Sequence, residues 1–294
     1  MARQSRVTGD GGPRSTLILL VTCSRDESRR DLAIRVTRNL AELAPRAGLA
    51  DSFVVFDNAS TFDDHLALVP PGAMICRSEQ NIGYWSAIQW VLASRDRLFG
   101  RRFRYLYIVE SDLVHWDLAP LGLCERFLDA EPRASCVRTQ EFSVRWRWRF
   151  DKRLQRLPFH VLRSQISLRN AVTDEKAWFR PAPGTPGLYL SNLHAKLPAL
   201  NRLDSLDRVF AELGEMASFS EADFFGTMLK HHPYCGVYDG GLFYSAVSWA
   251  DRHRSVLASY TDEGELARLG YQPTRTARIA RARTTVSVAR AGAS

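Results

Sequence analysis

Short apolar runs alternate with helical patterns along the first 113 residues. Residues 17–22 (LILLVT) are apolar almost throughout and too short for a helix, which is typical of a strand buried on both faces of a parallel sheet. Residues 28–44 then carry apolar side chains at helical spacing, and Pro45 is expected to stop that helix. Further strands are expected at residues 53–56, 73–76 and 105–109, and a second helix at about 82–94. This order of elements predicts an α/β, doubly wound fold.

The pattern is less regular after Pro120. Helices are expected at residues 121–130, 203–213 and 220–230, and strands at 135–138, 188–190 and 235–238. Ser220 is suited to cap the last helix. Beyond about residue 265 the chain has too few large apolar residues to fold alone.

These patterns divide the chain into three parts. Residues 1–16 are expected to form a flexible tail, residues 17–265 one folded domain, and residues 266–294 a second, basic and flexible tail. The domain itself divides into a first half at 17–118 and a second half at 119–265.

The net charge is informative only when its distribution along the chain is considered. The 294 residues carry a net charge of +8, but residues 1–16 contribute +2 and residues 266–294 contribute +6, so the predicted domain is neutral. A neutral domain argues against a nucleic-acid-binding fold. Composition, with 45% hydrophobic and 24% charged residues, excludes a wholly disordered or collagen-like chain.

Cysteine usage and the absence of long apolar runs indicate the compartment. The five cysteines form no CxxC pair and are odd in number, so we expect reduced, mostly buried thiols instead of a zinc knuckle or a disulfide framework. No apolar run approaches the roughly 20 residues of a spanning helix, and no secretory signal is seen. A cytoplasmic location is the expectation, with peripheral contact to the inner face of the membrane as its extension.

Polar side chains follow the predicted strands. Thr22 ends the first, Asp57 and Asn58 end the second, and Glu110 and Asp112 end the strand at residues 105–109. Ligands of open parallel sheets bind beyond the carboxyl ends of the strands. The sequence therefore predicts a binding site at this edge of the sheet.

Four motifs in order carry a family resemblance. The series LILLVTCSRDE, FVVFDNAS, RSEQNIGYWSAIQWVL and YLYIVESDL resembles the N-terminal half of the family 2 glycosyltransferases of the GT-A fold. The likeness covers residues 17–113 and is looser in the segments GLYLSNLHAKLPAL and SFSEADFF. It implies a GT-A-like, Rossmann-like, mainly parallel mixed sheet flanked by helices, with the nucleotide-sugar half first and the acceptor half second.

The resemblance implies a donor site in the first half. Asp57 would accept a hydrogen bond from the nucleotide base, with Thr22 near the same base or ribose. The alternative for Asp57 to Ser60 is a simple turn, because Asp, Asn and Ser favour turns. Gly83 would let the backbone approach the nucleotide-sugar, against the alternative of an ordinary helix entry. The expected nucleotide-sugar-binding residues are Thr22, Asp57, Asn58, Asn81, Gly83 and Glu110.

A divalent metal, Mg²⁺ or Mn²⁺, is the implied cofactor. A nucleotide diphosphate carries strong negative charge that a hard cation neutralises, held by a few carboxylates and the phosphates. Asp112 is the expected ligand and Glu110, where the family usually has Asp, the weaker one. His253 is a second metal candidate, because some GT-A enzymes place a C-terminal His on the metal. The structural alternative is that Glu110 and Asp112 are solvent-exposed acids and that His253 binds no metal.

Glu221 and Asp223 are the candidates for the catalytic base. An inverting transfer needs one carboxylate to take the proton of the acceptor hydroxyl. The family usually has adjacent Glu and Asp here, whereas this chain has Glu, Ala, Asp, and Glu221 is preferred. Acids that complement the dipole of a helix N-terminus are the structural alternative. His231 and His232 are expected in a surface turn.

The segment FSVRWRWRFDKRLQR concentrates positive charge. Residues 142–169 contain eight Arg or Lys against the single Asp151, a local charge of +7. Arg and Trp alternate at residues 145–149, so an extended chain would have one basic and one aromatic face. An edge strand, an acceptor-saccharide platform using Trp146 and Trp148, and a patch for anionic lipids are all open; stacking on single-stranded RNA is a minor alternative.

The function that these observations and the resemblance predict is metal-dependent transfer of a sugar from a nucleotide diphosphate-sugar to a hydroxyl acceptor. That the transfer inverts the sugar centre is implied by the resemblance alone. The acceptor would be a glycan or a lipid-linked sugar, in glycan or glycoconjugate biosynthesis. One alternative keeps the fold without catalysis, as a glycan- or nucleotide-binding protein. The other, an RNA-binding protein, is disfavoured by the neutral domain and the acidic strand ends.

Overall fold

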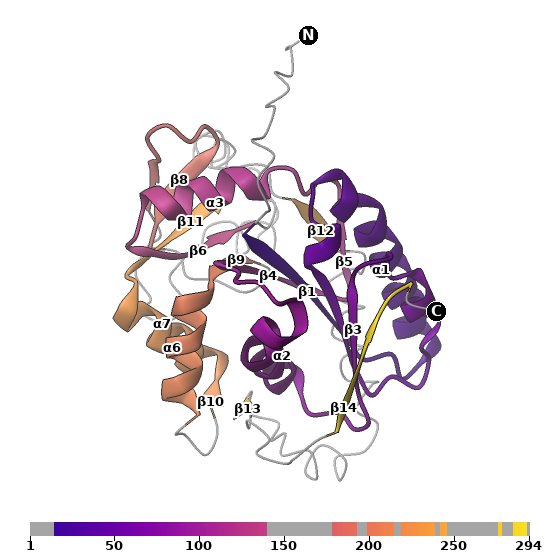
Figure 1. The fold of residues 1–294 in the computed structure, drawn as a ribbon. Helices are drawn as coiled ribbons and strands as arrows, with labels where there is room; N and C mark the ends of the chain where they lie inside the picture. Colours follow the sequence, from indigo (N-terminus) through magenta and orange to yellow (C-terminus); the bar gives the residue numbers. More distant parts are fainter. Residues whose placement is uncertain are drawn as a thin grey trace, which may run out of the picture.

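The computed structural model describes residues 15–139, 178–192, 199–214, 219–238, 242–245, 276–277 and 285–292. A ten-stranded sheet organises these residues, with the strand order β14-β3-β2-β1-β4-β9-β6-β11-β8-β7 (Figure 1). Seven of its strands run in one direction, and β14, β9 and β8 oppose them. The predicted fold class, a mixed and mainly parallel sheet flanked by helices, is confirmed.

The strands of this sheet are β1 (Thr16–Thr22), β2 (Phe53–Asn58), β3 (Met74–Ser78), β4 (Tyr105–Glu110), β6 (Ala134–Arg138), β7 (Phe179–Pro181), β8 (Leu188–Ser191), β9 (Ala199–Arg202), β11 (Tyr234–Tyr238) and β14 (Val286–Arg290). Two further pairs join β5 (Leu113–His115) to β12 (Phe243–Ser245) and β10 (Phe219–Ser220) to β13 (Thr276–Ala277). The helices are α1 (Glu27–Arg46), α2 (Tyr84–Phe99), α3 (Leu121–Ala130), α6 (Leu203–Leu213) and α7 (Glu221–His231), with short 3-10 helices η1 (Ala50–Ser52) and η2 (Asp64–Leu68).

Strand β1 is apolar between its terminal threonines because both of its faces are covered. Ile18 and Leu20 point into a core that α1 and α3 share, whereas Leu17 and Leu19 point into a second core that α2, α6 and α7 cover. All four side chains are fully buried. The chain thus forms helical layers on both sides of the sheet.

Helix α1 differs from its prediction at its C-terminal end. Pro45 lies inside the helix, which continues to Arg46. Gly48 follows two residues after the last helical residue. Its φ of 70° suits glycine, and its N–H donates to the Pro45 carbonyl. At the other end, the Asp26 carboxylate caps the helix by accepting a 2.8 Å hydrogen bond from the Arg29 N–H.

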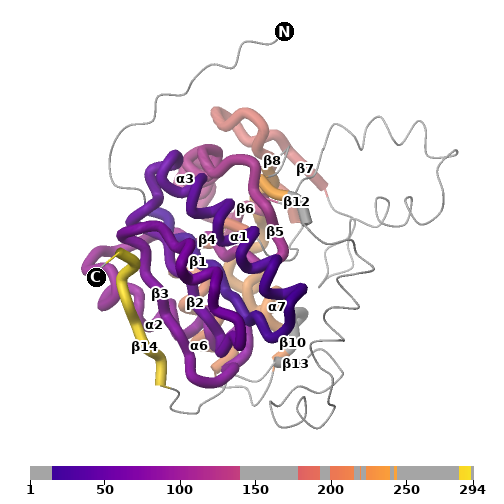
Figure 2. Tube along the Cα trace, turned by 90° about the vertical axis from the view of Figure 1, so that its right-hand side faces the viewer, coloured from indigo at the N-terminus to yellow at the C-terminus, as the bar shows by residue number. Residues whose placement is uncertain are grey.

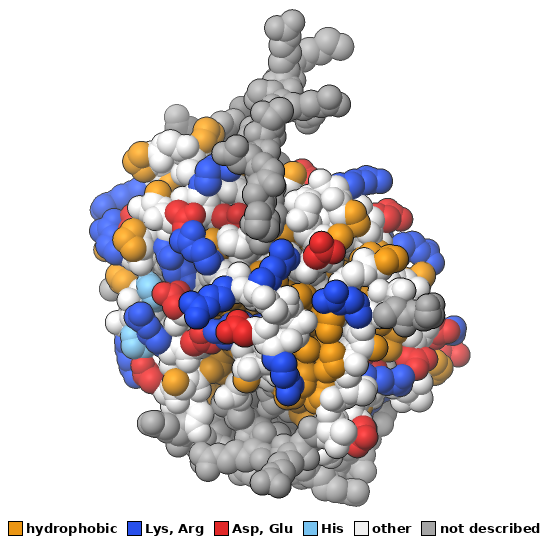
Figure 3. Space-filling view, viewed as in Figure 1, with side chains coloured by type: hydrophobic (Ala, Val, Ile, Leu, Met, Phe, Trp, Pro, Cys, Tyr) orange, Lys and Arg blue, Asp and Glu red, His pale blue; other side chains and the backbone are white. Residues whose placement is uncertain are grey.

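The prediction of a flexible C-terminal tail is wrong for residues 286–290. These residues form β14, which pairs antiparallel with β3 and places Val288 opposite Cys76. Figure 2 shows β14 as the yellow segment beside β3. Figure 3 shows an apolar area between α2 and β14. Val288 of β14 is 40% exposed. A strand of five residues forms here because a partner strand with unpaired backbone groups is available, which composition does not reveal.

The cysteines match their prediction as free thiols. Cys76, Cys124, Cys136 and Cys235 are buried and Cys23 is half-buried. Burial raises the pKa of Cys76 to about 12 and that of Cys136 to about 11, so these two thiols stay protonated near neutral pH. No helix in the described parts of the chain is both long and apolar enough to cross a membrane.

Candidate functional site

Four polar residues form a row across the carboxyl ends of neighbouring parallel strands. Arg77 of β3 is in register with Asp57 of β2, and Asp57 is in register with Thr22 of β1. On the other side of β1, Glu110 of β4 pairs with Val21, the residue before Thr22, so the Glu110 side chain points to the opposite face of the sheet. Strands in a sheet lie about 4.8 Å apart, so the row spans roughly 14 Å.

The row crosses the point where the chain reverses its direction of winding. After β1 the chain builds β2 and β3 on one side, and α2 then returns it to β4 on the other side of β1. α1 and α2 pack on opposite faces of the sheet. The carboxyl ends of β1 and β4 therefore form a topological switch point, the usual ligand position in such sheets.

Asp57 is the most completely enclosed member of the row. Its side chain is fully buried, and Oδ1 accepts hydrogen bonds from the Thr22 hydroxyl at 3.4 Å and the Ser60 N–H at 3.3 Å. The Ser60 hydroxyl in turn accepts a 2.8 Å bond from the Ser24 N–H. These bonds tie the end of β2 to the loop that follows β1.

Arg77 supplies the charge that a buried carboxylate requires. Its Nε lies 3.2 Å from Asp57 Oδ2, which makes an ion pair, and Oδ2 has no hydrogen-bond partner. Nη1 pairs with exposed Asp63 at 2.6 Å. The Arg77 side chain is 41% exposed, so it covers Asp57 from the solvent side.

His65 joins this group from η2, and the sequence analysis missed it. The side chain is fully buried, and Nε2 lies 3.0 Å from the Thr22 hydroxyl oxygen. Burial lowers the pKa of His65, against the opposing effect of Asp57 and two further carboxylates. A single histidine between short loop segments has no periodicity to reveal it, and only its closeness to two acids, Asp63 and Asp64, was visible in the sequence.

Asn58 and Asn81 connect β2 to the start of α2. The Asn58 amide donates to Asn81 Oδ1 at 2.8 Å and accepts from the Ile82 N–H at 2.9 Å. Asn81 Oδ1 also accepts from the Gly83 N–H at 2.8 Å. Gly83 has φ of 85° and precedes the helix, so the backbone conformation itself requires glycine there.

Glu110 ends β4 and Asp112 lies in the turn before β5, and both are half-buried. Two carboxylates that follow a buried strand fit a cation such as Mg²⁺, which uses one or two protein carboxylates and fills its remaining positions with water and substrate phosphates. Within the described ranges no group of three or more His, Cys, Asp or Glu side chains is gathered as a metal site. A cation bound by Glu110 and Asp112 would take its remaining ligands from water and substrate.

The segment with the expected catalytic base packs against the N-terminal end of α2. Glu221 is the first residue of α7, and Asp223, two residues further along, is exposed. The Trp85 ring of α2 stacks on Phe224 of α7 with centroids 4.5 Å apart and contacts Phe219 at 5.8 Å. This aromatic cluster holds the N-terminal ends of α2 and α7 together.

Several predicted residues fall elsewhere. Trp146, Trp148 and His253 lie outside the described residues. The prediction of a surface turn is wrong for His232, which is buried and bonded to the Ser205 hydroxyl at 2.8 Å. His231 ends α7 and contacts Glu212.

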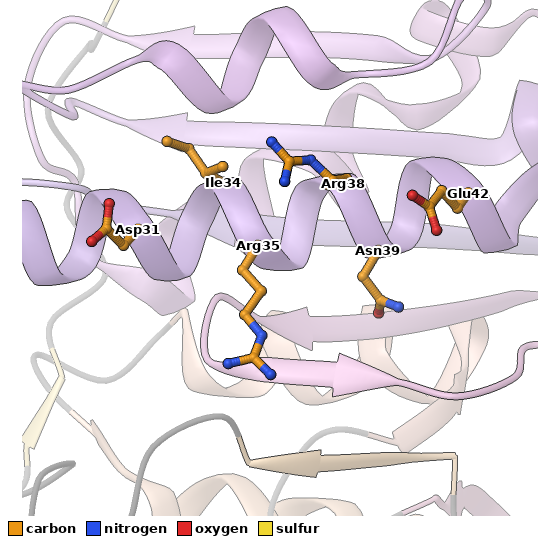
Figure 4. A pocket seen from close by; sticks show the side chains of 6 residues that line it. All are labelled: Asp31, Ile34, Arg35, Arg38, Asn39 and Glu42. Atoms are coloured by element: carbon orange, nitrogen blue, oxygen red, sulfur yellow. The ribbon is translucent and has the colours of Figure 1, made fainter.

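A hollow of about 400 Å³ lies along the outer side of α1. Figure 4 shows its lining side chains, which all come from that helix. Asn39, in this lining, bonds in both directions to the backbone of His115, at 2.8 and 2.7 Å. None of the predicted site residues contributes to this hollow, whose lining is Asp31, Ile34, Arg35, Arg38, Asn39 and Glu42.

Comparisons with known proteins give only distant matches. No protein-family model matches the chain, and no curated protein matches it. Among solved structures, TarS 1–349 of S. aureus is 15% identical over 86% of this chain and 68% of its own, with a TM-score of 0.45.

Glucosyl-3-phosphoglycerate synthase from Mycobacterium tuberculosis, in complex with Mg²⁺ and UDP, is 14% identical over 89% of this chain and 81% of its own, with a TM-score of 0.43. The same enzyme with Mn²⁺ and UDP-glucose matches with a TM-score of 0.42. At TM-scores below 0.5, these similarities by themselves assign no function.

Proposed function

We propose that the protein is a glycosyltransferase that moves a sugar from a nucleotide diphosphate-sugar to a hydroxyl acceptor, with inversion and with a divalent metal. The row of Thr22, Asp57 and Glu110 across the switch point is the observation that carries this proposal. It places a carboxylate suited to a base N–H on one side of β1 and acidic groups suited to a cation on the other. The ordered motifs of the sequence agree with this division.

In this proposal the donor lies along the row. Asp57 would accept a hydrogen bond from the nucleotide base, and Asn58 and Asn81 would hold the turn that approaches the sugar nucleotide. Because Asp57 is fully buried beneath Arg77, the base reaches the carboxylate only when Arg77 moves aside. The half-exposed guanidinium and its second anchor on exposed Asp63 allow that movement.

Glu110 and Asp112 would hold a divalent cation with the diphosphate. When bound, the cation would neutralise charge on the leaving diphosphate. Asp112, in the turn after β4, is the main ligand in this proposal, with His253 as a further candidate.

Glu221 would take the proton of the acceptor hydroxyl as its oxygen attacks C1 of the sugar, with Asp223 as the alternative base. The support is the contact of Trp85 in α2 with Phe224 in α7, which holds the start of α7 beside the start of α2. Three further parts of the proposal rest on the sequence alone. They are acceptor contacts by Trp146 and Trp148, an acceptor that is a glycan or lipid-linked sugar, and peripheral membrane contact.

Nucleotide titration tests the donor site. UDP, GDP and dTDP are titrated calorimetrically, each with Mn²⁺ and with EDTA, into the wild type, Asp112→Asn and the control Asp117→Asn. We expect micromolar binding of one nucleotide that requires metal, falls at least tenfold in Asp112→Asn and is unchanged in Asp117→Asn, because Asp117 is exposed beyond β5. No binding of any nucleotide by the wild type would refute the proposal.

Turnover tests the base. Release of nucleoside diphosphate from the matching nucleotide-sugar is followed for Glu221→Gln and Asp223→Asn. Loss of a general base costs roughly 10²–10⁴-fold in rate, so we expect kcat to fall by that factor in Glu221→Gln with nucleotide affinity kept. A wild type that binds nucleotide and turns over no nucleotide-sugar would favour the non-catalytic alternative.

A further inference from the structure

His65 is buried behind the row of polar strand ends without being part of it. Its imidazole is fully buried, Nε2 lies 3.0 Å from the Thr22 hydroxyl oxygen, and Nδ1 has no hydrogen-bond partner. The charged groups around it are Asp57, Asp63, Asp64 and Arg77. A buried polar ring with one bonded and one unpaired nitrogen requires an explanation.

The unpaired nitrogen defines the tautomer. Orphaned N–H donors are rarer in protein interiors than acceptors with an unused lone pair. If Nδ1 carried the proton, that N–H would be an orphaned donor, whereas an unprotonated Nδ1 leaves only a lone pair unused. The proton therefore lies on Nε2, and Nε2–H donates to the oxygen of Thr22.

The tautomer then sets the direction of the Thr22 hydroxyl. With its oxygen accepting from His65, the hydroxyl proton turns toward the Phe56 carbonyl or Asp57 Oδ1, both 3.4 Å away. A carboxylate is the stronger acceptor because the bond is charge-assisted. Asp57 Oδ1 thus receives the Thr22 hydroxyl and the Ser60 N–H, which leaves Oδ2 as the oxygen without a hydrogen bond.

We propose that His65 is a positioning residue for nucleotide-base recognition: through the Thr22 hydroxyl it holds Asp57 with Oδ1 occupied, so that Oδ2, which faces Arg77, accepts a base N–H once Arg77 moves aside. This role rests on the proposed function, and His65 itself touches no ligand. With His65 removed, Thr22 is free to turn toward the Phe56 carbonyl, and the Asp57 carboxylate is free to rotate. Both changes weaken recognition of the base more than recognition of the diphosphate.

Paired substitutions test this role by base selectivity. His65→Gln keeps an amide N–H near the place of Nε2, whereas His65→Phe keeps the bulk without a donor. Binding of UDP, GDP, dTDP and inorganic pyrophosphate is measured with Mn²⁺. For His65→Phe we expect at least a tenfold loss of affinity for the preferred nucleotide, less than a threefold change for pyrophosphate, and a KM for the donor that rises while kcat is kept. His65→Gln should restore affinity to within about threefold.

A matched control and a second variant keep the test decisive. His232 also bonds a buried hydroxyl, that of Ser205, between α7 and α6, so His232→Phe should lower stability with base selectivity unchanged. Thr22→Val removes the bridging hydroxyl and should reproduce the selectivity loss of His65→Phe. Equal losses for nucleotide and pyrophosphate, or unchanged selectivity in His65→Phe and Thr22→Val, would overturn the role.

Nitrogen chemical shifts separate this role from the proposed function. In ¹⁵N-labelled wild-type protein, long-range proton–nitrogen spectra should give the His65 ring in its neutral Nε2–H form, with a shift change in Thr22→Val. An Nδ1–H ring would overturn the positioning role even where nucleotide binds. An Nε2–H ring in a protein that binds pyrophosphate but no nucleotide would refute base recognition and the role with it.

Discussion

At the scale of single residues, the site depends on a few enclosed polar atoms that neighbouring groups hold in one arrangement. Arg77, Thr22 and the Ser60 N–H surround the buried Asp57 carboxylate. The same scale governs small residues of the core. Gly236 of β11 lies where a Cβ atom would meet the Phe127 ring at 2.5 Å and a Val137 methyl at 2.8 Å.

Gly236→Ala should therefore lower the free energy of unfolding by roughly 1–3 kcal/mol, the usual range for an overpacked core. Urea denaturation measures the change. Phe127→Leu removes ring atoms from the same place, so the double variant should be less destabilised than the sum of the two single variants. Strict additivity would show that Phe127 does not limit the space at Gly236.

At the scale of elements, β14 illustrates how a short strand depends on its partner. The Ala291 N–H bonds to the Ala73 carbonyl at 2.9 Å, and the Glu79 N–H bonds to the Thr285 carbonyl at 3.4 Å. Hydrogen-bonded and non-hydrogen-bonded pairs alternate in an antiparallel ladder. The Ala289 N–H is therefore directed at β3, and the Val288 N–H is directed away from it.

Proline tests this register, because it lacks the N–H donor. Ala289→Pro should lower the free energy of unfolding by about 1–3 kcal/mol, as its partner carbonyl on β3 loses a donor. Val288→Pro, on the same edge strand, should cost less because its N–H faces outward. Thermal and urea unfolding of both variants measure these changes. Equal losses in the free energy of unfolding would contradict the register.

At the scale of the whole molecule, buried histidines link stability to pH. Burial lowers the pKa of His115 to about 3 from the ordinary 6.5, and burial also lowers the pKa of His65 and His232. Below pH 6.5 the unfolded chain binds protons that the folded state rejects. The stability that these rings contribute is complete above pH 6.5 and decreases as the pH falls, for His115 down to about pH 3.

We expect the free energy of unfolding to decline from pH 6.5 toward pH 4.5, by up to about 1.4 kcal/mol per pH unit for each such ring. Urea denaturation at several pH values gives the slope. His115→Phe should flatten it by the contribution of one ring, since this histidine is fully enclosed. A stability that stays constant between pH 7 and 5 would contradict the burial of neutral histidines.

The first half of the fold and the polar residues at its strand ends could be predicted from the sequence because their signals are local. An apolar strand followed by Thr22, or by Asp57 and Asn58, is visible within about ten residues, and so is the helix pattern that follows. In a parallel sheet, carboxyl ends necessarily lie at one edge. The predicted row of strand ends was thus determined by the sequence alone.

Only the tertiary structure decided which side chains complete that row. Arg77 covers Asp57 because β3 adds beside β2 in register, and His65 reaches Thr22 across 43 residues of sequence through a 3-10 helix without periodicity. The short strands β9 and β14 and the contact of Trp85 with Phe224 also depend on partners distant in the chain. Backbone pairing and side-chain packing between distant segments leave no repeating pattern in the sequence, and for that reason these features appeared only in the folded chain.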